Sequence, residues 1–273
     1  MINRDRLATL RAKEDARFLA LHPKSGKMFK AGQKNMPGGV PMSWMAKWPG
    51  AYPVFVKEAK GARFSDVDGN TYIDFCLGDT GSMTGHSPDA TVAAIREQVG
   101  KGITAMLPTQ DAAIVSGELA KRFGLPLWQF TVSATDANRH VIRYSRMITG
   151  RSKIVVIDRC YHGSVDETFA TLNALGNTVA REGNIGAPVA LDQTTRVVEF
   201  NDIAGMEKAL AHGDVAAILM DSYAFSKPPV RLKLAKSSCS FSVPGLVTFV
   251  FGFCAPFSMQ YLHSITWPFN SIR

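Results

Sequence analysis

The sequence predicts an α/β fold with a mainly parallel sheet flanked by helices. Four short, continuously apolar runs have the length of buried strands. They are LWQFTV (127–132), KIVVID (153–158), TRVVEF (195–200) and VAAILM (215–220). Helical patterns at 136–150 and 202–213 separate them, and each ends at a glycine. Alternating strands and helices are typical of parallel sheets, in which ligands bind at the carboxyl ends of the strands.

The first 80 residues predict a smaller N-terminal segment made of a helix, a loop and a meander. The charged stretch 1–23 lacks the apolar core of a secretory signal and suits an amphipathic helix. A Pro/Gly-rich loop at 36–53 follows. Residues 54–75 then alternate apolar and polar around turn signals at 60–61 and 68–70, which predicts a small antiparallel meander.

Two further helices are predicted before the first apolar run of the sheet. SPDATVAAIREQVGKG (87–102) reads as a helix capped by Ser87, with Pro88 at its first position. TQDAAIVSGELAKRFG (109–124) repeats that design and is closed by Gly124. We therefore expect the main domain to occupy residues 81–220.

Four cysteines are spread along the chain without a C-x-x-C pair: Cys76, Cys160, Cys239 and Cys254. This spacing predicts neither a zinc site nor a disulfide framework, so no metal site is expected. Idle thiols and a charged N-terminus without a signal favour a protein of the reducing cytoplasm.

The net charge of +8 is distributed unevenly. Residues 222–273 hold five of the 31 basic residues and no acid, which leaves 26 basic against 23 acidic residues in the rest. A nearly neutral body has no extended basic field, and this argues against a nucleic-acid partner. Arg139, Arg143 and Arg146 share one helical face, which we interpret as a solvated or subunit-contact stripe.

The tail, residues 221–273, shows no sustained helical or strand period, and we expect it to lie outside the domain. A tail without any acid after Asp221, following an abrupt change of pattern, indicates an out-of-frame or read-through sequence. The alternative is a genuine shortened protein whose VRLKLAK cluster (230–236) binds a membrane surface or a partner. Residues 243–262 are apolar, but Pro244 and Pro256 argue against a membrane span.

A hydroxyl-rich turn follows the run at 127–132 and begins the next helical pattern. One interpretation is that Ser133, Thr135 and Asp136 serve only as helix caps. The other is that the N–H groups of the helix start bind a phosphate. Ser133 and Thr135 would then add hydroxyl donors, and the small Ala134 would let the backbone come close.

Tyr161, His162 and Gly163 follow the run at 153–158, at the expected carboxyl end of the neighbouring strand. An aromatic ring placed there can stack on a flat cofactor ring. Taken singly, Tyr161 could be a core residue and His162 an ordinary loop histidine. Together with the turn at 133–136, they predict a site for a planar ring that carries a phosphate.

A serine hydrolase built on Ser133 or Ser87, with His162 and Asp166, is a third interpretation. GHSPD (85–89) lacks the G-x-S-x-G pattern of a nucleophile elbow, and Ser87 fits a helix cap instead. The sequence therefore disfavours it.

Several motifs occur in a fixed order along residues 1–220. They are MPGG (36–39), GARFSDVDGNTYIDF (61–75), GHSPDATVAAIREQ (85–98), FTVSATDAN (130–138) and TGRSKIVVIDRCYHG (149–163). In this order they resemble the class III pyridoxal-phosphate aminotransferases, near the glutamate-1-semialdehyde aminomutase and β-amino-acid aminotransferase branches. The resemblance implies an incomplete fold-type I transferase large domain, a homodimer in the intact family, and amino-acid or oxo-acid substrates.

The resemblance also implies roles for individual residues. Those at the cofactor would be Ser133, Ala134, Thr135, Asp136, Tyr161 and His162. The first three would hold the phosphate, Tyr161 would stack on the pyridine ring, and His162 would support the turn. Asp136 stands at the family's acidic position near the cofactor. Trp44 could line an apolar substrate pocket, although a packed loop anchor fits it equally well.

Three departures from the family pattern affect these roles. Ala134 stands where the family has glycine, which permits a less close backbone approach. Asp136 replaces glutamate and is one methylene shorter. The loop around Trp44 has no arginine, so it offers no fork for a substrate carboxylate.

Transamination needs a Schiff-base lysine and a carboxylate that keeps the pyridine nitrogen protonated. In the family both follow the strand that VAAILM matches. Here no Asp or Glu follows Asp221, and the later lysines (227, 233 and 236) lie in the Pro/Ser-rich tail. We therefore expect amino-group transfer by family resemblance, in a truncated chain without that lysine. The alternative is a non-catalytic module that keeps the phosphate cradle and binds a partner.

Overall fold

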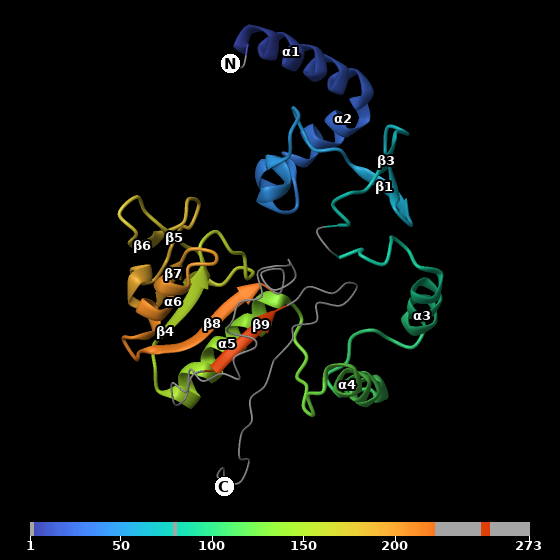
Figure 1. Cartoon of the computed structure of the whole chain (residues 1–273). Helices are drawn as coiled ribbons and strands as arrows, with labels where there is room; N and C mark the ends of the chain where they lie inside the picture. Colours follow the sequence, from blue (N-terminus) through green and yellow to red (C-terminus); the bar gives the residue numbers. More distant parts are fainter. Residues whose placement is uncertain (1–2, 79–80, 222–246, 252–273) are drawn as a thin grey trace. The chain divides into compact units, whose positions relative to one another are not determined.

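The computed structural model describes residues 3–78, 81–221 and 247–251. The chain divides into two compact units, Met1–Thr104 and Ala105–Arg273, and each is described by itself (Figure 1).

The first unit begins with two helices, α1 (Arg4–Leu21) and α2 (Pro23–Gly32). The side chain of Asn3 caps α1 by accepting the Arg6 N–H at 2.9 Å. The predicted first helix is thus confirmed, but none of its side chains is fully buried, and among the described residues only Phe18 is even half-buried, against the rings of His22 and Tyr52. Two 3-10 turns follow, η1 (Pro37–Gly39) and η2 (Ser43–Lys47).

The predicted meander is confirmed as an antiparallel sheet of β1 (Val56–Lys60), β2 (Arg63–Asp66) and β3 (Thr71–Ile73). Both predicted turns contain a glycine with positive φ, Gly61 at 57° and Gly69 at 97°. Glycine adopts this conformation without the steric cost that a Cβ would add.

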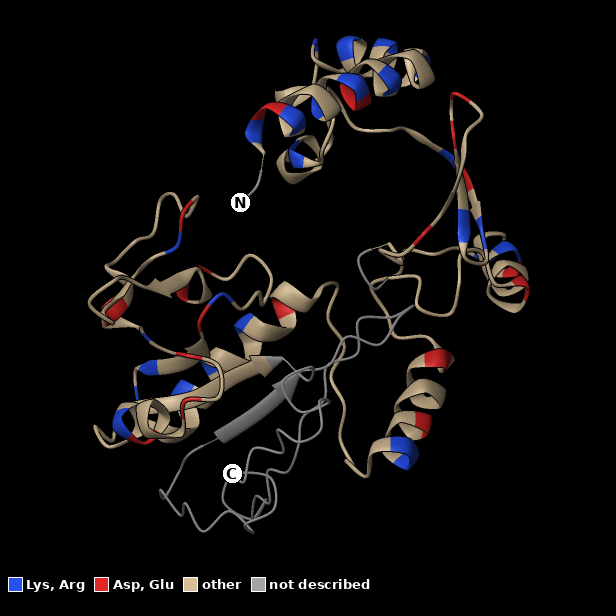
Figure 2. Cartoon of the chain, turned by 45° about the horizontal axis from the view of Figure 1, so that its top comes forward, with Lys and Arg blue, Asp and Glu red and all other residues tan. Residues whose placement is uncertain are grey.

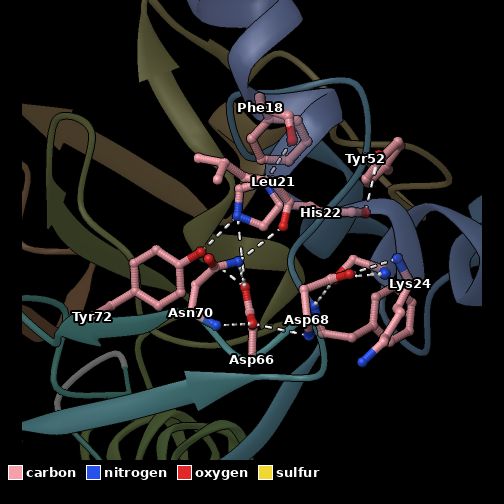
Figure 3. A network of polar contacts seen from close by, with 11 residues as sticks. Phe18, Leu21, His22, Lys24, Tyr52, Asp66, Asp68, Asn70 and Tyr72 are labelled. Atoms are coloured by element: carbon pink, nitrogen blue, oxygen red, sulfur yellow. Dashed lines mark hydrogen bonds and ion pairs between the residues drawn. The ribbon is translucent and has the colours of Figure 1, made fainter.

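The turn between β2 and β3 caps α2 from outside the helix. His22, at the N-cap position, makes no side-chain cap. Instead the Asp68 carboxylate accepts the N–H groups of Lys24 (2.6 Å) and Ser25 (3.0 Å), together with the Ser25 hydroxyl (2.8 Å) (Figure 3). The donors that a helix start leaves unpaired are therefore satisfied by a residue more than 40 positions away.

A buried polar network holds the helices to the meander (Figure 3). Asp66 has no exposed surface and accepts the Tyr72 hydroxyl at 2.9 Å and the Asn70 amide at 2.9 Å. The Tyr72 oxygen lies 2.6 Å from Nε2 of His22, whose Nδ1 donates to the Phe18 carbonyl at 2.7 Å. Burial raises the pKa of the Asp66 carboxyl group, which is the largest single effect. The hydrogen bonds that it accepts, first those from Asn70, lower the pKa by more in total, so the pKa stays below its usual range.

Helix α3 (Asp89–Val99) corrects the prediction for Ser87. Pro88 occupies the N-cap position and makes no side-chain cap. Ser87 has φ 49°, and its hydroxyl donates to the carbonyl of Ala59 at 3.0 Å. A tertiary hydrogen bond to the meander has replaced the local cap. Helix α4 (Gln110–Phe123), in the second unit, ends as predicted at Gly124, whose φ is 69°.

The second unit is built on a parallel sheet in the order β7-β4-β8-β9 (Figure 1). Its strands are β4 (Lys153–Ile157), β7 (Thr195–Val198), β8 (Val215–Asp221) and β9 (Val247–Phe251). The helices packed on this sheet are α5 (Ala134–Thr149) and α6 (Ile203–Leu210). The predicted strands at 153–158, 195–200 and 215–220 and both predicted helices are confirmed, within a few residues at their ends.

Helices α5 and α6 cover opposite faces of this sheet. Ile142 of α5 packs with Ile154 and Leu219, whereas Met206 of α6 packs with Val155. Because alternate residues of a strand point to opposite faces, neighbouring residues of β4 serve two core clusters. Each such fully buried aliphatic side chain contributes roughly 1.5–3 kcal/mol. This packing explains why the strands are apolar throughout.

Three features differ from the sequence prediction. Residues 127–132 form no strand, because no described strand pairs with them, and Val132 is 97% exposed. The structure also contains a hairpin of β5 (Ala170–Leu172) and β6 (Thr178–Ala180) that was not predicted. Its strands have only three residues each, which is too short for an alternating pattern to be recognised in the sequence. Within the tail, where the sequence shows no sustained period, Val247–Phe251 form β9 beside β8, and the VTFVF sequence favours a strand there. The rest of the tail lies outside the described residues. Two 3-10 turns complete the unit, η3 (Asp166–Thr168) and η4 (Leu191–Gln193).

Basic and acidic residues are interspersed along the described elements (Figure 2). No helix in the described part of the chain is both long and apolar enough to cross a membrane.

Candidate functional site

The N-terminus of α5 is closed by a reciprocal pair. Ser133 is the N-cap, and its hydroxyl oxygen accepts the Asp136 N–H at 3.2 Å. The same hydroxyl donates to Oδ2 of Asp136 at 2.8 Å. Ser133 therefore caps the helix, as one of the two interpretations of this turn predicts, while Asp136 lies in the first turn and is not itself the cap.

Thr135 contacts the turn that follows β4. Its hydroxyl accepts the N–H of Ser164 at 3.0 Å, so its own hydrogen remains available for another acceptor. Gly163 has φ 81°, and a Cβ built there would lie 2.9 Å from the Thr135 Cα. Only glycine combines that backbone conformation with so close an approach. The helix start and the turn are thus packed backbone to backbone.

His162 is buried beneath this turn. Its carbonyl accepts the side-chain amide of Asn138 at 2.8 Å. Burial lowers the pKa of the His162 imidazole to about 4, because the charged form would lose its hydration. The ring is therefore neutral near pH 7.

Tyr161 is 55% exposed, and its ring centroid lies 6.5 Å from that of Phe169. The backbone on either side of it is held. Arg181 donates to the Cys160 carbonyl at 2.7 Å, and Asn138 donates to the His162 carbonyl. An accessible aromatic ring on a fixed backbone can present its face to a planar ligand.

Six of the seven predicted site residues lie together in the second unit. Ser133, Ala134, Thr135 and Asp136 form the first turn of α5, and Tyr161 and His162 lead into the turn that packs on it. Trp44 lies in η2 of the first unit, where its ring contacts that of Trp48 at 6.5 Å between centroids. Asn138 is not among the residues predicted from the sequence, although Thr135, Asn138 and Arg139 have the i, i+3, i+4 spacing of one helical face.

This arrangement suits an anion next to a flat ring. The start of a 16-residue helix carries partial positive charge and unpaired N–H groups. The Thr135 hydroxyl adds a donor. The Asp136 carboxylate opposes an anion, and the Ser133 hydroxyl hydrogen is directed at that carboxylate. An incoming phosphate must therefore compete with Asp136 for one donor.

Comparisons with known proteins place this chain in a family. Residues 44–222 match the family model described as "Aminotransferase class-III". The chain is similar to the glutamate-1-semialdehyde 2,1-aminomutase of Methanocaldococcus jannaschii, with 32% identity over 201 residues. It is 35% identical over 209 residues to that of Polaromonas naphthalenivorans. These matches cover 72% and 75% of this chain but 47% of each relative, so the chain spans about half the length of the curated relatives it matches.

Solved structures of aminomutases and transaminases also match this chain over about half of their own length. The structure of a glutamate-1-semialdehyde aminomutase from Pseudomonas aeruginosa superposes with a TM-score of 0.77 at 49% identity, over 81% of this chain and 49% of that one. A lysine-to-alanine variant of that protein was solved in complex with PMP. A transaminase with PLP bound matches with a TM-score of 0.65 at 32% identity, over 73% of this chain and 47% of that one.

The sequence resemblance and the fold class are thereby confirmed, and the described sheet is an incomplete fold-type I large domain. Because the family model covers well over half of the sequence, the chain belongs to the class III aminotransferase family.

Proposed function

We propose that the first turn of α5 and the turn after β4 form a cradle for pyridoxal 5′-phosphate. The observation that carries this proposal is the packing of Gly163 on Thr135. It joins an anion-binding helix start to a loop whose Tyr161 ring is accessible. Membership of the class III aminotransferase family and relatives with PLP or PMP bound support the proposal.

The residues present fit the group. The N–H groups of the helix start and the Thr135 hydroxyl would hold the phosphate, and the Tyr161 ring would lie against the pyridine ring. Neutral His162 would keep the turn in place beneath it. Gly163 has no side chain that would separate the two elements. When bound, the cofactor supplies the electron sink that lets an amino group leave or join a carbon.

The proposed reaction class is amino-group transfer, either between an amino acid and an oxo acid or within one substrate. The aminomutase relatives favour the second variant. Homodimer formation belongs to the same proposal. A second candidate is a non-catalytic, truncated module that retains the cradle, binds the cofactor reversibly and without covalent attachment, and pairs with a partner.

The test uses pyridoxamine 5′-phosphate, because it has no aldehyde and cannot react with surface lysines. Its affinity for the full chain is measured by fluorescence and compared with that of pyridoxamine, which lacks the phosphate. We expect the phosphorylated ligand to bind at least about tenfold more tightly, as several charge-assisted hydrogen bonds would give. Equal, weak binding of both ligands would refute the proposal.

Matched variants locate the site. Thr135→Val and Tyr161→Ala should each weaken binding. Thr149→Val removes a hydroxyl from the other end of α5, and Tyr144→Ala removes a ring that is 51% exposed. Both controls should bind like the wild type. If the controls weaken binding as much as the test variants, the ligand lies elsewhere.

A further inference from the structure

Three side chains on one face of α5 hold the turn after β4. Thr135 accepts the N–H of Ser164, Asn138 donates to the carbonyl of His162, and Arg139 donates to the carbonyl of Ser164 at 2.9 Å. Their i, i+3, i+4 spacing places them in one row along the helix. The turn is therefore tied to α5 at His162 and at Ser164.

Asn138 differs from the other two in its burial. It is 2% exposed, and its Nδ2 makes the 2.8 Å bond to His162, whereas its Oδ1 has no hydrogen-bond partner among the described residues. Burying an amide with one group unpaired costs free energy, and an apolar side chain would avoid that cost. The bond to the His162 carbonyl is thus the one contact that sets Asn138 apart from a core aliphatic residue.

The bonded carbonyl belongs to the residue directly after Tyr161. The carbonyl directly before it, that of Cys160, is held by Arg181. Tyr161 consequently has a backbone fixed from both sides and a ring that stays exposed. Of the two bonds that flank Tyr161, only the one from Asn138 connects its backbone to α5, because Arg181 lies in the segment after β6.

We propose that Asn138 is a positioning residue that sets where the Tyr161 ring stands relative to the first turn of α5. It does not touch the ligand. It fixes the spacing between the phosphate-binding end of the site and its ring-binding end. This inference rests on the proposed function, since it concerns the same cradle.

The proposal predicts that loss of the Asn138 side chain weakens binding of pyridoxamine 5′-phosphate but not binding of inorganic phosphate. In Asn138→Ala, the affinity for pyridoxamine 5′-phosphate should fall about tenfold, the loss expected when one buried hydrogen bond no longer orders a contact. The affinity for inorganic phosphate should stay within about twofold, because the helix start is intact. Arg139→Ala, which removes the exposed bond to the same turn, should change both affinities by less than about twofold.

The coupling to Tyr161 is the decisive readout. If Asn138 acts through that ring, the double variant Asn138→Ala/Tyr161→Ala binds pyridoxamine 5′-phosphate no more weakly than Tyr161→Ala alone. If the role of Asn138 is purely structural, Asn138→Ala lowers the affinities for pyridoxamine 5′-phosphate and for inorganic phosphate by the same factor, or the losses caused by Asn138→Ala and Tyr161→Ala add up in the double variant. Either result overturns the proposal. Asn138→Gln keeps the amide and provides the same test if the alanine variant does not fold.

The two proposals fail in different ways. If the wild type binds pyridoxamine 5′-phosphate no better than phosphate, the cradle itself is refuted. If the wild type binds it tightly and Tyr161→Ala weakens it, but Asn138→Ala does not, only the positioning role of Asn138 is refuted.

Discussion

Ser133 and Asp136 hydrogen-bond to each other in both directions at the start of α5. The hydroxyl accepts the Asp136 N–H and donates to the Asp136 carboxylate. A negative charge therefore occupies the position where a helix start attracts anions. Two functions predicted for this turn, helix cap and phosphate site, use the same hydroxyl.

Asp136→Asn should raise the affinity for phosphate. The amide oxygen can still accept the Ser133 hydroxyl, but the negative charge that repels a phosphate is gone. We expect a gain of about two- to fivefold at low ionic strength, the range of a single charge at a helix terminus. Isothermal titration with inorganic phosphate measures it. Asp202→Asn removes the carboxylate that caps α6 and should leave the affinity unchanged. A loss of affinity in Asp136→Asn would contradict the prediction.

His162 should make stability depend on pH. The pKa of a histidine side chain is ordinarily 6.5, and burial lowers that of His162 to about 4 in the folded chain. Between these values the unfolded chain binds a proton that the folded chain does not bind. The stabilisation is therefore complete above pH 6.5 and is lost as the pH falls toward 4, by an amount on the order of 3 kcal/mol at most.

Urea unfolding between pH 7 and pH 4.5 measures this dependence. His162→Gln should remove the part of the slope that is due to His162. His140→Gln, at an exposed position on α5, should keep the slope of the wild type. An unchanged slope in His162→Gln would show that other groups cause the loss.

Gly163→Ala should separate the two halves of the cradle. At φ 81° an alanine is strained, and its methyl group would meet the backbone of Thr135. Gly176→Ala is the matched control, because Gly176 has φ 74° and nothing within 4 Å of a built Cβ. We expect the control to lose about 1–2 kcal/mol from backbone strain alone. Gly163→Ala should lose at least about 1 kcal/mol more and also bind pyridoxamine 5′-phosphate more weakly. Equal losses would mean that the close approach does not matter.

Tyr72→Phe should lower the free energy of unfolding of the first unit. The lost hydroxyl bridges His22 and the buried Asp66 carboxylate, and its pKa is raised to about 12 by burial and by that carboxylate. Leaving Asp66 with one donor fewer should cost about 1–3 kcal/mol. Hydrogen exchange of the amides in β2 and β3 reports on this unit separately. Tyr52→Phe removes a single 3.1 Å bond to the His22 carbonyl and should have the smaller effect.

Local patterns in the sequence predicted the parts of the site that depend on local structure. The hydroxyl turn at Ser133 begins a helix because its cap lies within four residues, and Gly150 ends that helix through its own backbone. The turn at Tyr161 was placed correctly because the apolar run before it forms a buried strand. What remains a prediction is the role of these residues toward a ligand.

The errors arose where distant residues decided the structure. Ser87 resembles a cap, but the Ala59 carbonyl takes its hydroxyl. The apolar run at 127–132 resembles a strand, but strand formation needs a neighbour, and no described strand pairs with it. Asn138 was overlooked because its partner, the His162 carbonyl, lies 24 residues away. Periodicity within one segment contains no information on such pairings.

The capping of α2 by Asp68 also affects when this helix can become stable during synthesis of the chain. A ten-residue helix is too short to be stable alone in water, and α2 has no side-chain cap at its own start. The residue that supplies the cap is 44 positions further along the chain. During synthesis at about 5–20 residues per second, Asp68 follows Lys24 by roughly two to nine seconds. Throughout that interval the nascent helix lacks its cap, so we expect α2 to become stable only after the turn between β2 and β3 has been made.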